Sequence, residues 1–306
     1  MSVIHPSAVV DRRAELGPDV QIGPFCYVGP DVVLGEGCIL HAHVTLFGPA
    51  SFGSRNEFYP HCTLGSPPQD LKYRGGPTRL VVGDGNIFRE QVTVHRGTEV
   101  DRQSGGITRI GSHNLLMVGV HIAHDAELGS HLIIANQVQL AGHVRIENCV
   151  TVGGGTAMHH FVTVGRYAYV AGVSRITHDV PPYMKVEGYD QEVRAVNVTG
   201  MQRWRIGPES ITAMKAAFRL LFARRGNRSP GRTAEAIRQI EANGLLRDEH
   251  VAYLVEFLKR KLAVGVFGRV REHYRSDRPE DRANFYGLAR LERAPRSAGR
   301  SAEPRP

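Results

Sequence analysis

Residues 4–46 read IHPSAVVDRRAELGPDVQIGPFCYVGPDVVLGEGCILHAHVTL, and in this stretch a large apolar side chain returns at every sixth position. The spacing continues to residue 176, interrupted only at residues 65–81 and 95–109. The 26 positions of the row are Ile4, Val10, Leu16, Ile22, Val28, Leu34, Leu40, Leu46, Phe52, Phe58, Leu64, Val82, Phe88, Val94, Ile110, Leu116, Ile122, Leu128, Ile134, Leu140, Ile146, Val152, Met158, Val164, Val170 and Ile176. A period of six fits neither a 3.6-residue helix nor an alternating strand, so it indicates an internal repeat.

A six-residue repeat predicts a parallel β-helix, in which each unit is one short strand plus a turn and three units close one triangular coil. We expect the large apolar side chains to fill the prism, and Gly or Asn to take the special backbone angles at the turns. Stacked coils would hydrogen-bond to one another at a spacing of about 4.8 Å. The alternative is a β-sandwich of short strands, but its turns would not recur at a fixed interval of six.

The pattern divides the chain into three predicted parts. We expect a β-helix over residues 1–188, with loops at 65–81 and 95–109 extruded from its corners, where binding chemistry tends to lie. Amphipathic helical patterns follow, which predicts a C-terminal α-helical domain over residues 189–286. Residues 287–306 are poor in large apolar side chains and are predicted to form a disordered basic tail.

The charge is unevenly distributed along the chain. The net charge is +8, with 15 basic and 18 acidic side chains in residues 1–200 but 23 and 12 in the remainder. A basic third suits nucleic acid, an anionic membrane face or an acidic protein partner. Nucleic acid is the least favoured, because the aromatic residues there lie mostly on helix faces and form no stacking platform.

Several classes of protein are excluded by what the sequence lacks. It has no run of about 18 apolar residues, so we expect no transmembrane segment. Its N-terminus, MSVIHPSAVV, does not read as a secretory signal. The four cysteines form no CxxC pair, which argues against a disulfide framework or a zinc knuckle. A cytoplasmic protein is expected.

Histidines concentrate in a few neighbouring repeats. Thirteen of the fifteen lie in residues 1–200, and with eighteen residues per coil His124 would stack over Gly142, with His160 one coil further along. Such a strip suits zinc ligation by neutral imidazoles, as in β-helical carbonic anhydrases, or general-base catalysis by one imidazole that Asp125 supports. Spacing alone leaves both chemistries open.

Several motifs make a more specific identification possible. They resemble the O-acyltransferases that act on UDP-N-acetylglucosamine in the first step of lipid A synthesis, a family within the hexapeptide-repeat acyltransferases. The matching stretches are IGPFCYVGP (22–30), QDLKY (69–73), VTVHRGT (92–98), NLLM (114–117), HIAHD (121–125), LAGHV (140–144), AMHHF (157–161) and DVPPY (179–183). The resemblance covers roughly residues 1–225. The related N-acyltransferases carry a uridine-binding domain before their repeats, whereas these repeats begin at residue 4.

The resemblance implies a left-handed parallel β-helix that assembles as a homotrimer, with active sites between subunits. The implied reaction transfers an (R)-3-hydroxyacyl group from acyl carrier protein to the glucosamine 3-hydroxyl of UDP-N-acetylglucosamine. It needs neither a cofactor nor a metal.

Residue roles follow from the same resemblance. His124 would be the general base, Asp125 would support it, and the N–H of Gly142 would face the oxyanion. The matching substrate-contact positions are Asp70, Lys72, His95, His121, His143, His159 and His160. Asn197 and Arg203 match nucleotide-contact positions. Gly172 matches the position that sets acyl length, and its lack of a side chain predicts a longer acyl chain.

The chain departs from the family's usual residues at Tyr189, Asp190, Thr199, Trp204 and His160. These departures leave N-acetylglucosamine and a 3-amino analogue both open as the acceptor sugar. Two competing functions remain: a non-catalytic β-helical scaffold that binds a nucleotide sugar, and a zinc-dependent β-helical carbonic anhydrase.

The basic C-terminal third suggests where the acidic carrier protein would dock. We expect arginines on a helix over residues 210–225 to contribute, namely Arg219, Arg224 and Arg225.

Overall fold

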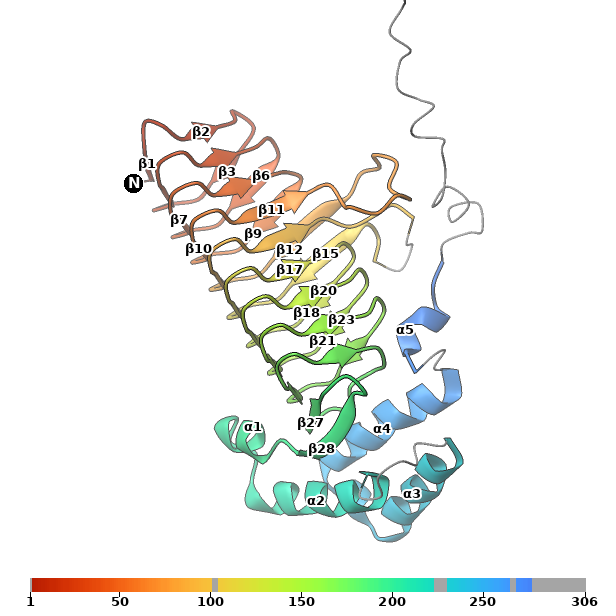
Figure 1. Cartoon of the computed structure of the whole chain (residues 1–306). Helices are drawn as coiled ribbons and strands as arrows, with labels where there is room; N and C mark the ends of the chain where they lie inside the picture. Colours follow the sequence, from red (N-terminus) through yellow and green to blue (C-terminus); the bar gives the residue numbers. More distant parts are fainter. Residues whose placement is uncertain (1, 101–103, 223–229, 265–267, 277–306) are drawn as a thin grey trace, which may run out of the picture.

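The computed structural model describes residues 2–100, 104–222, 230–264 and 268–276, and its main body is a three-sided prism of short strands (Figure 1). Sheet A contains β1 (Val3–Ile4), β4 (Gln21–Ile22), β7 (Ile39–Leu40), β10 (Glu57–Phe58), β13 (Ile87–Phe88), β16 (Leu115–Leu116), β19 (Ile133–Ile134), β22 (Thr151–Val152), β25 (Tyr169–Val170), β27 (Met184–Glu187) and β28 (Glu192–Val196). Sheet B contains β2 (Val9–Val10), β5 (Tyr27–Val28), β8 (Thr45–Leu46), β11 (Thr63–Ser66), β14 (Thr93–His95), β17 (His121–Ile122), β20 (Gln139–Leu140), β23 (Ala157–Met158) and β26 (Arg175–Ile176). Sheet C contains β3 (Glu15–Leu16), β6 (Val32–Leu34), β9 (Ala50–Phe52), β12 (Arg79–Val82), β15 (Ile107–Ile110), β18 (Glu127–Leu128), β21 (Arg145–Ile146) and β24 (Thr163–Val164).

Successive coils stack in register along the prism. Gln21 pairs with Ile39, and Ile133 pairs with Thr151, so partners in these sheets are eighteen residues apart. The spacing grows to 30 residues between Glu57 and Ile87 and to 28 between Thr93 and His121. These longer coils contain the segments for which loops at 65–81 and 95–109 are predicted. The bounds of those loops stay predictions.

The repeating apolar row fills the prism. Phe58 and Phe88 are both fully buried, and their rings stack in parallel at 5.0 Å. The row fails only at the N-terminal end, where Ile4 is 45% exposed. Its side chain lies in the first coil, which has no coil beneath it to cover the interior.

The turns between strands differ from expectation in composition. We call the edge that follows sheet A corner A, and name corners B and C in the same way. Positive φ angles occur there as expected, but many belong to residues other than Gly or Asn, such as Phe25, His43 and Tyr167. Such angles cost non-glycine residues roughly 1–2 kcal/mol each. Hydrogen bonds between coils hold them, as when the N–H of His43 donates to the carbonyl of Pro24.

Helices cover the C-terminal end of the prism, below the last coils in Figure 1. They are α1 (Val198–Arg203), α2 (Pro208–Phe222), α3 (Pro230–Ala242), the 3₁₀ turn η1 (Leu245–Arg247), α4 (Glu249–Val264) and α5 (Val270–His273). A second apolar core joins them to the prism through Tyr183, Met214 and Leu254. Among the described residues, no helix combines the length and apolarity that crossing a membrane requires. The boundary between residues 188 and 189 stays a prediction, and Arg224, Arg225 and the tail at 287–306 lie outside the described residues.

The stacked pair in the prism generates a stability prediction. Replacing Phe88 with Ala leaves a cavity beside Phe58, and we expect the free energy of unfolding to fall by roughly 3–5 kcal/mol. Phe25, which is 63% exposed, supplies the matched control, because its replacement by Ala removes a ring that the core does not need. Denaturant unfolding measures both. Equal losses in the two variants would contradict this account of the core.

Candidate functional site

Two columns of side chains lie along corner B, in the turns after β17, β20 and β23. One column is the second residue after the buried apolar residue of each strand, namely His124, Gly142 and His160. The other column is the third residue after it, namely Asp125, His143 and Phe161, with φ angles of 59°, 63° and 65°. Each N–H in the second column reaches the coil before it, as when His143 donates to the carbonyl of His124 at 3.0 Å. The ladder between coils therefore positions the functional side chains.

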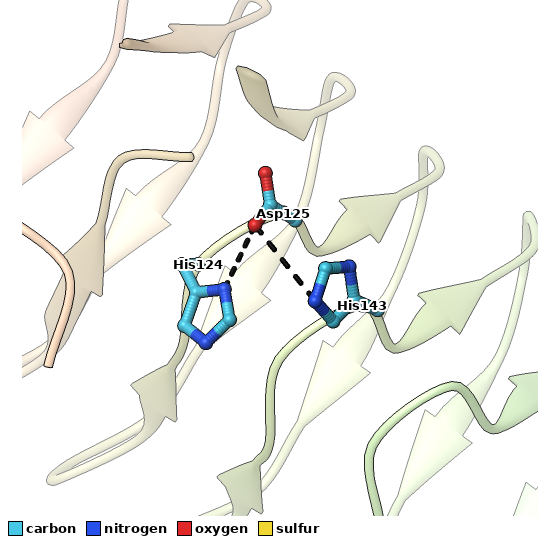
Figure 2. A group of neighbouring side chains, drawn as sticks. All are labelled: His124, Asp125 and His143. Carbon is cyan, nitrogen blue, oxygen red and sulfur yellow. Dashed lines mark hydrogen bonds and ion pairs between the residues drawn. The ribbon is translucent and has the colours of Figure 1, made fainter. Parts of the chain in front are cut away.

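His124 and Asp125 form a hydrogen-bonded pair. Nδ1 of His124 lies 2.8 Å from Oδ2 of Asp125 (Figure 2). An ionised carboxylate only accepts hydrogen bonds, so Nδ1 carries the proton. The neutral ring then has its lone pair on Nε2, which makes that nitrogen a base.

Asp125 is fully buried and saturated with donors. Its Oδ1 accepts from the N–H of Thr98 at 2.9 Å and from the hydroxyl of Ser104 at 2.6 Å, and its Oδ2 accepts from the hydroxyl of Thr98 at 2.7 Å. Burial alone would raise the pKa of Asp125, but the hydrogen bond from His124, the charges of His143 and His124 and the Ser104 hydroxyl hold it below its ordinary value. The carboxylate is therefore ionised at neutral pH.

His124, Asp125 and His143 form a group of side chains that could hold a metal ion. Ligand atoms of His124, Asp125 and His143 lie within 4.8 Å of one another, and Asp125 lies between the two rings in Figure 2. However, the oxygens of Asp125 already accept four hydrogen bonds, so this carboxylate has no lone pair left to bind a metal. The donor set therefore favours a His–Asp pair over a zinc cage.

Gly142 lies directly against the His124 ring. A Cβ added at Gly142 would lie 2.6 Å from Cε1 and 2.7 Å from Nε2 of that ring, so no larger residue fits without moving the base. Within the described part of the chain, no backbone carbonyl accepts the N–H of Gly142. Other coils carry proline at the same turn position, as at Pro24 and Pro30, so the ladder does not need this N–H. It can serve a ligand.

Asp70 and Lys72, which follow β11, reach the base from outside the prism. Oδ2 of Asp70 lies 3.5 Å from Nε2 of His124, and Nζ of Lys72 lies 3.3 Å from the same oxygen. Two acceptors, the carboxylate and the imidazole lone pair, thus converge on one point. A hydroxyl placed there could donate its one proton to either acceptor.

Two further histidines, His95 and His121, lie close to His124, and burial together with the charge of His124 lowers their pKa values. Burial, followed by the charges of His121 and His124, lowers the pKa of His95 to about 4. Among the described residues, no hydrogen-bond partner meets the buried Nδ1 of His95. His121 lies beside it and shares a hydrogen bond of 2.8 Å with the hydroxyl of Thr93.

His160 is neutral for a similar reason. Its ring lies 3.8 Å from the ring of His159, between centroids. Burial, then the charges of His159, Arg269, Arg275 and His143, lower the pKa of His160 to about 3.

A cavity of about 660 Å³ opens in front of the base. Six predicted residues line it: Asp70, Lys72, His124, Gly142, His143 and His160. The sequence prediction missed its other lining residues, which are Gln69, Leu71, Ala141, Phe161 and Arg275. Eighteen-residue stacking would have found Phe161, whose ring lies parallel to His143 at 4.3 Å, but no sequence signal indicated Arg275.

Three predicted site residues lie away from corner B and its cavity within one chain. Gly172 follows β25 at corner A, where an added Cβ would come within 3.1 Å of the carbonyl oxygen of Gly154. Asn197 caps α1 and donates to the carbonyl of Tyr167 at corner C. Arg203 is exposed at the end of α1, next to Trp204, whose ring contacts His131 at the same corner. The fold does not bring these three residues to His124.

Comparisons with known proteins agree with this geometry. The family described as "Udp N-acetylglucosamine O-acyltransferase; Domain 2" matches residues 179–266, and the bacterial transferase hexapeptide family matches residues 13–48. An acyl-[acyl-carrier-protein]–UDP-N-acetylglucosamine O-acyltransferase from Saccharophagus degradans is 45% identical over 224 residues, which cover 73% of this chain and 86% of that protein.

Solved structures resemble the whole fold. LpxA from Acinetobacter baumannii is 38% identical with a TM-score of 0.78, over 84% of this chain and 97% of that chain. The UDP-N-acetylglucosamine O-acyltransferase from Moraxella catarrhalis is 36% identical with a TM-score of 0.76, over 84% and 96%. The predicted fold class, a left-handed parallel β-helix followed by a helical region, is confirmed.

The neutral state of His160 generates a pH prediction. Its folded-state pKa lies below the ordinary value of 6.5, so the unfolded chain binds more protons between about pH 6.5 and pH 3. Stability therefore falls as the pH drops through this range. We expect His160→Gln to lose less melting temperature between pH 7 and pH 5 than the native protein loses. His5→Gln, at an exposed position, should lose as much melting temperature as the native protein between pH 7 and pH 5. A decrease of native size in His160→Gln would count against a buried neutral His160.

Proposed function

The chain belongs to the UDP-N-acetylglucosamine O-acyltransferase family, and we propose that the cavity in front of His124 is where it carries out the acyl transfer. The reaction moves an acyl group from acyl carrier protein to UDP-N-acetylglucosamine, as predicted. The finer assignment is transfer of an (R)-3-hydroxyacyl group to the glucosamine 3-hydroxyl.

The observation that carries this proposal is the contact of 2.8 Å between Nδ1 of His124 and the buried carboxylate of Asp125. Nδ1–H of His124 donates a hydrogen bond of 2.8 Å to Asp125. The lone pair on Nε2 then faces the cavity beside Asp70. A sugar hydroxyl bound at this point would donate its proton to Nε2 while its oxygen attacks the thioester carbonyl carbon. Asp125 stabilises the imidazolium that forms.

The remaining steps return the proton. The tetrahedral oxyanion would accept a hydrogen bond from the N–H of Gly142, which no backbone carbonyl among the described residues uses. When the intermediate collapses, the bond between carbon and sulfur breaks, and the thiolate of the carrier's prosthetic group takes the proton from Nε2. No covalent enzyme intermediate is required.

The surrounding polar residues suit a nucleotide sugar. Lys72 supplies a positive charge, and neutral His95 and His121 offer ring nitrogens for hydroxyl or carbonyl groups. His143, His159 and His160 continue this surface toward the C-terminal end of the prism. Gly172 would leave room for a longer acyl chain.

The separation of the predicted residues supports a homotrimer. His124 lies at corner B, Gly172 at corner A, and Asn197 and Arg203 beside corner C, so one site can contain them all only if neighbouring subunits contribute. A closed ring of three prisms would place corner B of one subunit against another corner of the next. Active sites would then lie between subunits, with Asn197 and Arg203 on the nucleotide.

Docking of the acidic carrier protein is proposed at the basic helical end, in the cytoplasm. Arg219 is exposed on α2 and is available for it. The two competing functions are less favoured. A scaffold needs no saturated His–Asp pair, and a carbonic anhydrase needs a metal site that Asp125 does not offer.

Replacing the base tests the mechanism. We expect His124→Gln to lower kcat by roughly 10²–10⁴-fold, because Gln cannot accept the proton, with little change in melting temperature. Product formation from UDP-N-acetylglucosamine and 3-hydroxyacyl carrier protein, identified by mass, is the measurement. His5→Gln controls for the same change at an exposed site; native kcat in His124→Gln would refute the assignment of the base.

Mixing two defective subunits tests the shared site. We expect His124→Gln and Arg203→Ala each to be poorly active as pure proteins. Trimers that form at random from equal amounts of both would recover about a quarter of native activity, because one in four interfaces pairs two native contributions. Mixtures no more active than the pure variants would show that each site lies within one chain.

A further inference from the structure

The segment at residues 268–276 extends beyond the part of the chain that the family description matches, which ends at residue 266. After α4 it returns to the side of the prism, and Figure 1 places α5 beside the coils near β23. It thus approaches corner B, where His124 and the cavity lie.

Specific contacts hold this segment on the prism. The N–H of Asp179 donates to the carbonyl of Gly268 at 2.8 Å, and Oδ2 of Asp179 accepts from the N–H of Val270 at 2.8 Å. Arg269 is buried and donates to the carbonyl of Thr177 at 2.7 Å.

A close backbone approach and an ion pair add to this docking. Gly268 has a φ of +72°, and a Cβ there would lie 2.4 Å from Cδ2 of His178, so only glycine suits the approach. Further along, Arg271 pairs with Glu127 of β18 at 3.0 Å. The segment is therefore a built part of the cavity wall.

The docked segment carries Arg275 into the cavity. Arg275 lines the cavity together with His160 and Phe161, and its guanidinium carbon lies 5.6 Å from the centre of the Phe161 ring. The ring of Phe161 is itself stacked on His143, which borders the base. A cation is thus placed at the coil of Phe161, two coils beyond the coil of His124.

The charges around the cavity suggest what this cation meets. The part of the cavity wall that Arg275 shares contains the Phe161 ring and His160, whose neutral imidazole adds no positive charge. A guanidinium over an apolar, partly desolvated wall suits a phosphate group, which it binds with two parallel hydrogen bonds.

We propose that Arg275 is a substrate-positioning residue that binds a phosphate of one of the two substrates. The inference rests on the proposed acyl transfer. Two phosphate sources are present in that reaction: the diphosphate of the nucleotide sugar, and the phosphodiester of the carrier protein's phosphopantetheine arm. The Phe161 ring would hold the guanidinium plane while the phosphate approaches from the open side.

The experiment uses the full-length protein and three variants. Arg275→Gln removes the charge, and Arg275→Lys keeps it without the planar fork. Arg260→Gln is the matched control, because Arg260 is an exposed arginine of α4 that does not line the cavity. KM and kcat are measured for each substrate while the other is saturating, and melting temperatures are recorded.

We expect Arg275→Gln to raise the KM of one substrate about tenfold with kcat within about twofold of native, and Arg275→Lys to recover part of the loss. Comparing acyl-phosphopantetheine with acyl-pantetheine as acyl donors shows which substrate supplies the phosphate that Arg275 binds. If the arm's phosphate is the ligand, the native protein prefers the phosphorylated donor and Arg275→Gln does not. If the diphosphate is the ligand, the KM of UDP-N-acetylglucosamine rises instead.

Three results would overturn the proposal. Arg275→Gln could leave both KM values unchanged, it could lower kcat alone, or Arg260→Gln could raise the same KM by the same factor. The native protein separates this failure from failure of the proposed function. If it transfers no acyl group from any donor, the function is wrong, whereas native activity with an indifferent Arg275→Gln rejects only the role of Arg275.

Discussion

Hydrogen bonding between stacked coils is the constraint on which the rest of the structure depends. Each strand is two to five residues long and would have no stability alone, so its backbone groups must pair with the coils above and below. That pairing fixes which residues lie over one another. It also supports positive φ angles in residues with side chains, and at corner B those residues include Asp125, His143 and Phe161. The chemistry of the site is thus a consequence of the stacking.

The protonation states in the site follow from the burial of one carboxylate, Asp125, among several histidine side chains. Asp125 is ionised because donors saturate it, and His95 and His160 remain neutral because burial penalises their charged forms. The protein therefore keeps several ring nitrogens as neutral hydrogen-bonding groups near His124, the ring for which we propose proton transfer. Gly142 is needed because the two coils approach so closely that the ring occupies the space of a Cβ.

Much of this arrangement could be predicted from the sequence, because a fixed period converts sequence distance into spatial distance. The apolar row, the pair His124 and Asp125, and the stacking of His124 on Gly142 all follow from that rule. The rule fails where the chain leaves the period. Thr98 and Ser104 lie inside the second break, where the spacing of partners grows to 28 residues, so their bonds to Asp125 were not foreseen. Arg275 reaches the cavity from the segment after α5, and its position depends on tertiary contacts that no local pattern encodes. Ile4 is exposed because periodicity says nothing about the ends of a stack.

The uniform coil has a consequence for how this architecture can change in length. Adding or deleting a few residues within a coil, without extruding them as a loop, would move every later side chain to a different edge, whereas inserting a complete turn of eighteen residues preserves all three edges. Such an insertion between corner B and the helical end would move the two apart by about 4.8 Å. The distance between His124 and the helical end of the prism is therefore adjustable only in discrete steps, and divergence within such proteins should concentrate where the period is broken.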